Sequence, residues 1–233
     1  MLKEKDLDIA LSCHLLYTKQ AKGAIVKLLK RHYPDTWEDI FEKIQKRYVN
    51  YLKDYRRDLG GKKNFHNGVG GNYDGIFYFC MWEICKGEIT FTEVEQNYDE
   101  LMRPTYAWMK LLNGNNRLVK CLMYFAFKNV KGRCDVFGDY NMQVDPYDKN
   151  KPLTYHFTTC PVAEFAREHG FTDILPALCN VDYSIMDAMH VRLIRKQTLG
   201  FADNCDYMMV GDKDPLVKEH PRYRDEKGYI RNK

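Results

Sequence analysis

The sequence lacks any uninterrupted apolar run approaching the roughly 18 residues that a membrane span needs. The first residues, MLKEKDLDIALSCHLL, mix acidic side chains with lysines and hold no small-residue cleavage site, so a signal peptide is not expected. We therefore expect a cytoplasmic protein that does not contact membranes. In that compartment its eight cysteines should be mostly reduced thiols.

Two further absences narrow the function. No cysteine pair has the CxxC spacing, and the irregular spacing suggests neither a disulfide framework nor a zinc ribbon. Charge is balanced, with 36 basic and 32 acidic residues, and no region concentrates basic side chains without acidic neighbours. Nucleic acid is therefore not an expected partner. The expected partner is a small-molecule substrate, and a homo-oligomer remains open.

The first half of the chain has the pattern of a helical protein. Hydrophobic residues make up 45% of the sequence and aromatic residues 14%, which is enough for a sizeable core. Apolar spacing, capping residues and helix breakers predict four helices, over 5–31, 35–59, 73–85 and 92–112. The second is capped by Asp35 or Thr36 and ends at Gly60-Gly61. The fourth is kinked or divided near Pro104. The third is apolar on every side and should be buried, with Cys80 and Cys85 in the core.

The glycine-rich stretch Asn64–Gly71 lacks the Lys and Ser/Thr of a phosphate-binding loop. It is interpreted as a flexible turn or a lid.

The character of the chain changes after Asn113. Leu118–Phe127 fits a helix or a strand equally well, because periodicity cannot decide between them. Strands are predicted over 136–144, 154–159, 191–199 and 205–210, and helices over 161–169 and 172–189. This order favours an α+β fold, an antiparallel sheet with helices packed on one face, over a doubly wound fold. We expect a helical portion over 1–112 and an α+β catalytic-like portion over 113–212, integrated in one domain, followed by a tail over 213–233.

Cys160 is the most informative thiol in the sequence. It follows a predicted strand and precedes Pro161, a preferred first helical residue, which places it at a helix N-cap. The helix dipole and nearby amide groups would lower the pKa of a thiol there. His156 shares the alternating face of Cys160 and would serve as its base. Equally, Cys160 could simply cap the helix while His156 is an ordinary polar residue.

Cys179 and Asp182 lie three residues apart within the apolar stripe of the 172–189 helix. A buried carboxylate is costly unless it is paired. Arg195 is the candidate partner, because it shares strand parity with Val191 and Leu193. Such a pair either ties the helix to the sheet or holds a carboxylate for proton transfer.

A metal site is the less favoured interpretation of the same region. Cys160, Cys179 and Cys205, with Asp182 or a histidine, would satisfy a tetrahedral zinc ion. Their spacing is long-range and nonstandard, so no metal or other cofactor is predicted.

The segment from Cys160 to Val210 resembles the L-2-amino-thiazoline-4-carboxylic acid hydrolase family. The resemblance rests on Cys160-Pro161, on Cys179 with Asp182, on Arg195 with Thr198-Leu199, and on Cys205-Asp206-Tyr207. The family's glycine shortly before the last cysteine is displaced here to Gly200.

The resemblance implies hydrolysis of a five-membered amino-thiazoline ring, or of a related small heterocycle or amide, at a C–N or C–S bond. That reaction needs a nucleophile, a proton donor and a cation for the substrate carboxylate. Cys160 or Cys179 as nucleophile and Asp182 as acid or base fit the first two roles. Arg195 fits the third, and His156, Thr198 and Cys205 are further candidate substrate contacts.

Two other classes of protein fit the pattern. The scattered cysteines also resemble those of vinyl-reductase-like sensory domains, which would make this a non-enzymatic module for a small ligand or zinc. A structural or partner-binding helical protein would leave Asp182 and the thiols without a shared site.

Overall fold

The computed structural model describes residues 17–54, 72–137 and 140–233. The chain divides into two compact units, Met1–Leu101 and Met102–Lys233, which are described separately. In the described part of the chain, no helix is both long enough and apolar enough to cross a membrane.

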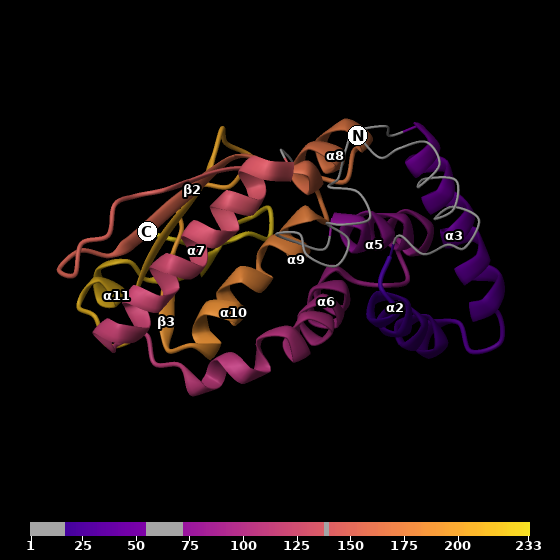
Figure 1. The fold of residues 1–233 in the computed structure, drawn as a ribbon. Coiled ribbons are helices and arrows are strands. Elements are labelled where there is room, and N and C mark those ends of the chain that lie inside the picture. The colour runs from indigo at the N-terminus through magenta and orange to yellow at the C-terminus, as the bar shows by residue number, and fades with distance from the viewer. Residues whose placement is uncertain (1–16, 55–71, 138–139) are drawn as a thin grey trace. The chain divides into compact units, whose positions relative to one another are not determined.

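The described part of the first unit is helical (Figure 1). Helix α3 packs against α5 and α2, and the ring of Phe77 stacks on Tyr17 at 4.0 Å between centroids. Asp74 accepts hydrogen bonds from the amide and hydroxyl of Thr18, at 2.6 and 2.8 Å, and so fastens the start of α2 to α5. The helices are α2 (Lys19–His32), α3 (Trp37–Asp54), α5 (Asn72–Cys85) and α6 (Phe91–Tyr106), the last of which extends past Leu101.

Most of the helices predicted for this half are confirmed. Helix α5 is buried as expected, with Cys80 and Cys85 in the core. Within the described residues of the predicted 5–31 helix, α2 begins at Lys19, because the Thr18 side chain accepts the amide of Ala21 and caps it. Residues 5–16, the end of the second predicted helix at 55–59 and the glycine-rich stretch Asn64–Gly71 lie outside the described residues.

The sequence predicted that Thr92 caps the helix over 92–112, and the start of α6 corrects that cap. Thr90, not Thr92, caps the helix: its hydroxyl accepts the Glu93 amide, and the Glu93 carboxylate accepts the Thr90 amide and hydroxyl. This reciprocal arrangement is a capping box. The helix then runs through Pro104 to Tyr106 and tightens into the 3₁₀ helix η1 (Ala107–Leu111), so the expected division follows the proline by a few residues.

The second unit is built on a four-stranded antiparallel sheet in the order β1-β2-β4-β3. The predicted α+β fold is confirmed. The strands and helices are α7 (Arg117–Phe137), β1 (Asn141–Val144), β2 (Leu153–Thr159), α8 (Pro161–His169), α9 (Leu175–Cys179), α10 (Val181–Ala188), β3 (Val191–Ile194) and β4 (Cys205–Gly211).

One face of this sheet carries the core. Tyr155 on β2 stacks on Tyr207 of β4, with 4.5 Å between ring centroids, and also packs against Phe127 of α7. Tyr207 in turn reaches Asp182 of α10. Helices α7 and α10 therefore cover the same face, and Figure 1 shows both lying along the strands.

Several boundaries differ from the prediction for physical reasons. The ambiguous segment 118–127 is helical, and α7 continues to Phe137, so the strand predicted from Val136 is limited to β1. The strand predicted to Leu199 ends at Ile194, because the amides of Lys196 and Gln197 bind the Asp206 carboxylate instead of a neighbouring strand.

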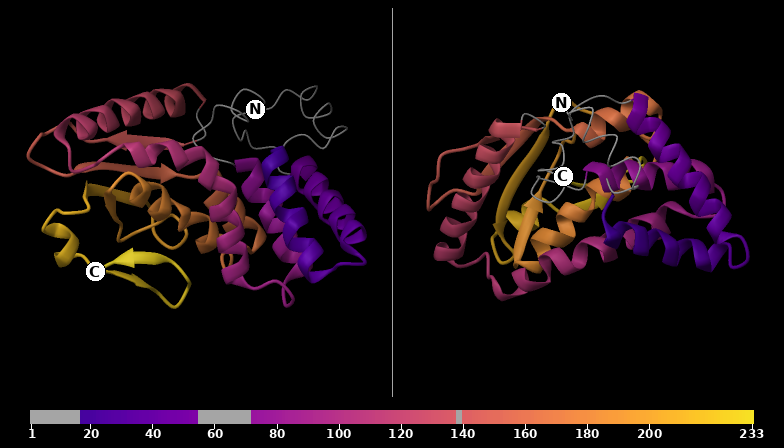
Figure 2. Two further views of the ribbon diagram at one scale, coloured as in Figure 1. Left: turned by 90° about the horizontal axis from the view of Figure 1, so that it is seen from below. Right: turned by 45° about the vertical axis from the view of Figure 1, so that its right-hand side comes forward.

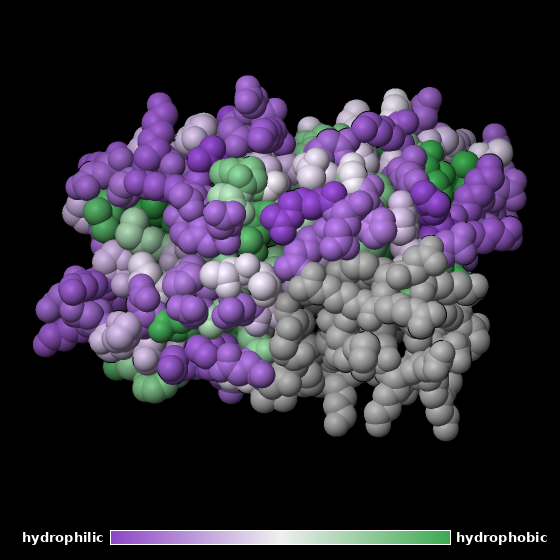
Figure 3. Space-filling model, turned by 90° about the horizontal axis from the view of Figure 1, so that it is seen from above, coloured by the Kyte–Doolittle hydropathy of each residue, from purple (hydrophilic) through white to green (hydrophobic). Residues whose placement is uncertain are grey.

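The helix predicted over 172–189 is divided at Asn180. The Asn180 side chain binds the backbone of Gly228 and Ile230. These two residues belong to the C-terminal region, which contains α11 (Leu216–Glu219), β5 (Arg222–Arg224) and β6 (Ile230–Asn232). Figure 2 shows the β5–β6 hairpin in yellow beside the label of the C-terminus. The molecular face in Figure 3 is mostly hydrophilic, with hydrophobic residues in small separate patches.

Candidate active site

Asp182, near the start of α10, is held through one oxygen only. Its Oδ2 accepts hydrogen bonds from Arg195 Nη1 at 2.9 Å and from the Tyr207 hydroxyl at 2.8 Å. No hydrogen bond to Oδ1 is made by any described residue, and the Asp182 side chain is 31% exposed. The predicted pairing with Arg195 is confirmed, but the carboxylate is half-buried, not enclosed in the apolar stripe. It faces solvent with one free oxygen in a fixed orientation.

Arg195 is the buried member of the pair. Its side chain is 1% exposed, and Nη2 also donates to the Cys179 carbonyl at 3.1 Å. Burial lowers the pKa of the guanidinium, but Tyr207 and Asp182 outweigh that effect and hold the pKa well above its usual value. Arg195 therefore orients Asp182 and the end of α9 from within the protein.

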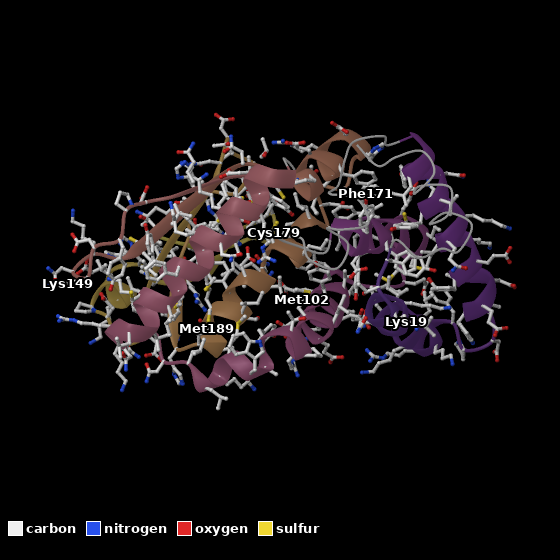
Figure 4. All side chains as sticks on the ribbon, in the orientation of Figure 1. Lys19, Met102, Lys149, Phe171, Cys179 and Met189 are labelled. Carbon is white, nitrogen blue, oxygen red and sulfur yellow. The ribbon has the colours of Figure 1, made fainter. Side chains whose placement is uncertain are left out.

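Cys179 lies where α9 meets α10 (Figure 4). Burial raises the pKa of its thiol well above the usual value, and the nearby Arg195 guanidinium opposes that shift. Cys205, Cys160 and Asp182 lie close enough to raise it further. The structure therefore brings Cys179 and Asp182 together beside a buried cation, as the spacing predicted.

Cys160 is at the N-cap of α8, as predicted, in an extended conformation with Pro161 first in the helix. The prediction of a lowered thiol pKa is wrong. Burial and the nearby Cys205 raise it to about 12, against the opposing effect of the Ala163 and Val162 amides and the Tyr140 hydroxyl. Desolvation therefore outweighs the amides of the helix terminus here.

Thr198 and Cys205 are turned into the protein. Thr198 is 1% exposed and accepts the Gly200 amide with its hydroxyl, while Cys205 Sγ accepts the Leu199 amide at 3.1 Å. Burial raises the pKa of the Cys205 thiol. These contacts shape the turn before β4.

His156 lies on the other face of the sheet. It is opposite Asp206 in the strand register, whereas Phe157 is opposite Cys205 on the covered face. With Lys196, Asn204 and Asp206 it lines a separate cavity of about 280 Å³. His156 is therefore not a described partner of Cys160, which lies beyond the end of β2 at the N-cap of α8.

A zinc site is the alternative interpretation of these thiols. Across 17–54, 72–137 and 140–233, no group of three or more His, Cys, Asp or Glu residues is arranged to hold a metal ion. The thiols of Cys160, Cys179 and Cys205 are neighbours without forming such a group.

Sequence reasoning missed the part of the site that follows Asp212. Asn232 Oδ1 accepts the Arg195 amide and the Tyr183 hydroxyl, at 3.0 and 3.1 Å. Tyr229 is 1% exposed, and no described residue makes a hydrogen bond to its buried hydroxyl. Cys179 and Cys205 are close enough to influence its pKa. The sequence signal for this part of the site was the apolar and amide residues of the stretch YIRN at 229–232. The charged residues around that stretch obscured it.

The helix-covered face of the antiparallel sheet in this α+β unit thus carries a carboxylate, a buried guanidinium and thiols. The family model described as L-2-amino-thiazoline-4-carboxylic acid hydrolase matches residues 108–209 of this chain. The match agrees with the resemblance found in the sequence, and the matched segment includes Cys160, Cys179, Asp182, Arg195 and Cys205. No curated protein and no solved structure matches the chain.

Proposed function

We propose that this protein is a hydrolase that opens a small cyclic amidine, of the 2-amino-thiazoline type, at the carbon–sulfur bond. The observation that carries the proposal is the state of Asp182, whose Oδ2 is fixed by Arg195 and Tyr207 while its side chain stays 31% exposed. A carboxylate fixed in this way suits the N–H groups of an amidine, which it would bind and orient. The match to the hydrolase family supports the reaction class.

Cys179 is the nucleophile in this proposal. It lies three residues before Asp182, and its carbonyl accepts a hydrogen bond from the same Arg195 guanidinium that holds the Asp182 carboxylate. Because burial keeps the resting thiol protonated, its proton must leave as it attacks. Asp182 is the adjacent group that would accept that proton.

The chemical steps balance with one water molecule. The Cys179 sulfur bonds to the amidine carbon, the ring C–S bond breaks, and the departing sulfur takes a proton. Water then attacks the same carbon and releases the Cys179 thiol. The product is a urea that carries the freed thiol of the substrate.

Arg195 has a positioning role in this scheme. The sequence suggested it as the anchor for a substrate carboxylate, but its side chain is 1% exposed and already binds Asp182 and the Cys179 carbonyl. Arg195 therefore fixes the positions of Asp182 and Cys179, the two groups that act in the reaction.

The test measures thiol release from 2-amino-thiazoline-4-carboxylate. Cys179→Ser and Asp182→Asn should each lower kcat/KM by at least about 100-fold, and the double variant should be little worse because the two groups act as a unit. Cys121→Ser, a half-exposed thiol on α7, is the matched control and should keep full activity. Circular dichroism checks that every variant is folded.

Three results would contradict the proposal. Full activity of Cys179→Ser together with loss in Cys160→Ser would move the nucleophile to the helix N-cap. Full activity of both Cys179→Ser and Cys160→Ser would rule out the thiol mechanism. A wild-type protein that opens no cyclic amidine would remove the proposed reaction itself.

A further inference from the structure

A second cavity lies in the same unit at the start of α7, and its walls are strongly basic. It has a volume of about 460 Å³ and lies between the first turn of α7, the loop before β2 and the end of β4. Its floor is apolar, with Met123, Leu153 and Met209 among the lining residues. Five cations line it, Arg117, Lys120, Lys149, Lys151 and Lys213, against the single carboxylate of Asp214.

These cations differ in how far they are already engaged. Lys120 is committed to the protein, since its Nζ donates to the carbonyls of Asp148, Lys149 and Lys151 and so ties the loop to α7. Lys151 also lies 3.8 Å from the Asp148 carboxylate.

The other three cations, Arg117, Lys149 and Lys213, have no ion-pair partner in the described part of the chain. All three are exposed, and Figure 4 labels Lys149 in the loop that borders the cavity. They are free to bind an anion that enters.

The wall of the cavity is closely fitted. A Cβ at Gly211 would lie 2.3 Å from Asn115 Oδ1, and one at Gly114 would lie 2.2 Å from Val191 Cγ2. Asn115 Oδ1 also accepts the Lys213 amide at 3.1 Å. These contacts hold the start of α7 against the end of β4, so that Arg117 and Lys213 line one cavity. The positive end of the α7 dipole adds to their field.

We propose that this cavity binds a phosphorylated small molecule, with the phosphate at Arg117, Lys149 and Lys213 and the organic part on the apolar floor. A volume of about 460 Å³ falls in the range of small-molecule sites. The inference is independent of the proposed hydrolase activity, because none of the groups of the candidate active site lines this cavity.

The experiment titrates the full chain with 1-naphthyl phosphate, followed by its fluorescence, and compares two triple variants of equal charge. Arg117→Gln/Lys149→Gln/Lys213→Gln should bind at least about tenfold more weakly than the wild type, since it loses all three free cations. Lys110→Gln/Lys128→Gln/Lys227→Gln removes three exposed cations that do not line the cavity and should bind within about twofold of wild type. 1-Naphthol, which lacks the phosphate, should not bind saturably.

A second measurement needs no variant. In ¹⁵N spectra of the wild type, the phosphate probe should shift the amide signals of Gly114, Gly211 and Lys213. Inorganic pyrophosphate should displace it, at concentrations below those at which a short single-stranded oligonucleotide does.

Four results would overturn the proposal: equal loss of affinity in the two triple variants, equal affinity for 1-naphthol, amide shifts confined to other parts of the chain, or stronger displacement by the oligonucleotide. None of them bears on amidine hydrolysis, so the two proposals fail separately.

Discussion

Arg195, almost fully buried, and Asp182, one-third exposed, share a 2.9 Å ion pair that connects the protein interior to its surface. The cation cannot reach solvent, whereas the carboxylate keeps one oxygen free of described partners. In such a pair the carboxylate balances the buried positive charge, and the guanidinium fixes the orientation of the carboxylate. This asymmetry leads to the first prediction.

Arg195→Met should destabilise the protein by about 2–3 kcal/mol, at the lower end for a broken buried pair because Asp182 remains partly hydrated. Arg192→Met, on β3 just before Arg195, is the control. Arg192 pairs with Asp187 where both side chains are more than a third exposed, so its loss should cost no more than about 1 kcal/mol. Urea unfolding measures both, and equal costs would show that burial of Arg195 contributes nothing.

Gly200→Ala should destabilise the protein by about 1–3 kcal/mol through overpacking, because its Cβ would lie 1.8 Å from the Tyr229 hydroxyl oxygen. Combining it with Tyr229→Phe removes that oxygen and should recover part of the loss. Gly132→Ala is the control: it lies within α7 with nothing near its Cβ, and it should stabilise by about 0.5–1 kcal/mol. Strict additivity of the Gly200 and Tyr229 changes in thermal unfolding would contradict the contact.

Alkaline pH should weaken the fold through Cys160. Burial raises the pKa of this thiol from its ordinary value of 9.0 to about 12, so the folded protein holds the proton more tightly than the unfolded chain. The resulting stability is fully present below about pH 9 and is lost as the pH rises toward 12. Urea midpoints at pH 7.5 and 10.5 should therefore differ less in Cys160→Ala than in the wild type. Cys121→Ala should keep the wild-type difference, and a Cys160→Ala protein with the same difference would refute the assignment.

Acid should weaken the first unit through Glu93. The Thr90 amide and hydroxyl, with a smaller contribution from His32, lower the pKa of this carboxyl from 4.5 to about 2. Its contribution is present above about pH 4.5 and is lost as the pH falls toward 2. Glu93→Gln should flatten the acid dependence of the unfolding midpoint in that window. Thr90→Ala should cost about 1 kcal/mol at neutral pH through the lost cap.

Local signals predicted much of this structure. The apolar run over 73–85 predicted a buried helix, the Cys160-Pro161 pair predicted the start of α8, and strand parity predicted the pairing of Arg195 with Asp182. Each depends on residues near one another in sequence, where the helical and strand periods fix orientation.

The missed features depend on distant residues. The division of the 172–189 helix follows from hydrogen bonds of Asn180 to Gly228 and Ile230. The high pKa of the Cys160 thiol follows from burial by the whole fold. Neither could be predicted from local pattern, because both arise only when the chain is packed. The catalytic roles of Cys160, Cys179 and Asp182 stay predictions until the variants are measured.

The bond from Ile230 N–H to the Asn180 side chain gives the candidate active site a spectroscopic reporter. Asn180 lies between Cys179 and Asp182, so loosening of that turn should release the amide of Ile230. Deuterium exchange at this single position therefore records how often the turn between the two groups opens, without any label on the groups themselves. A ligand bound at Asp182 should slow that exchange even if it never touches the hairpin.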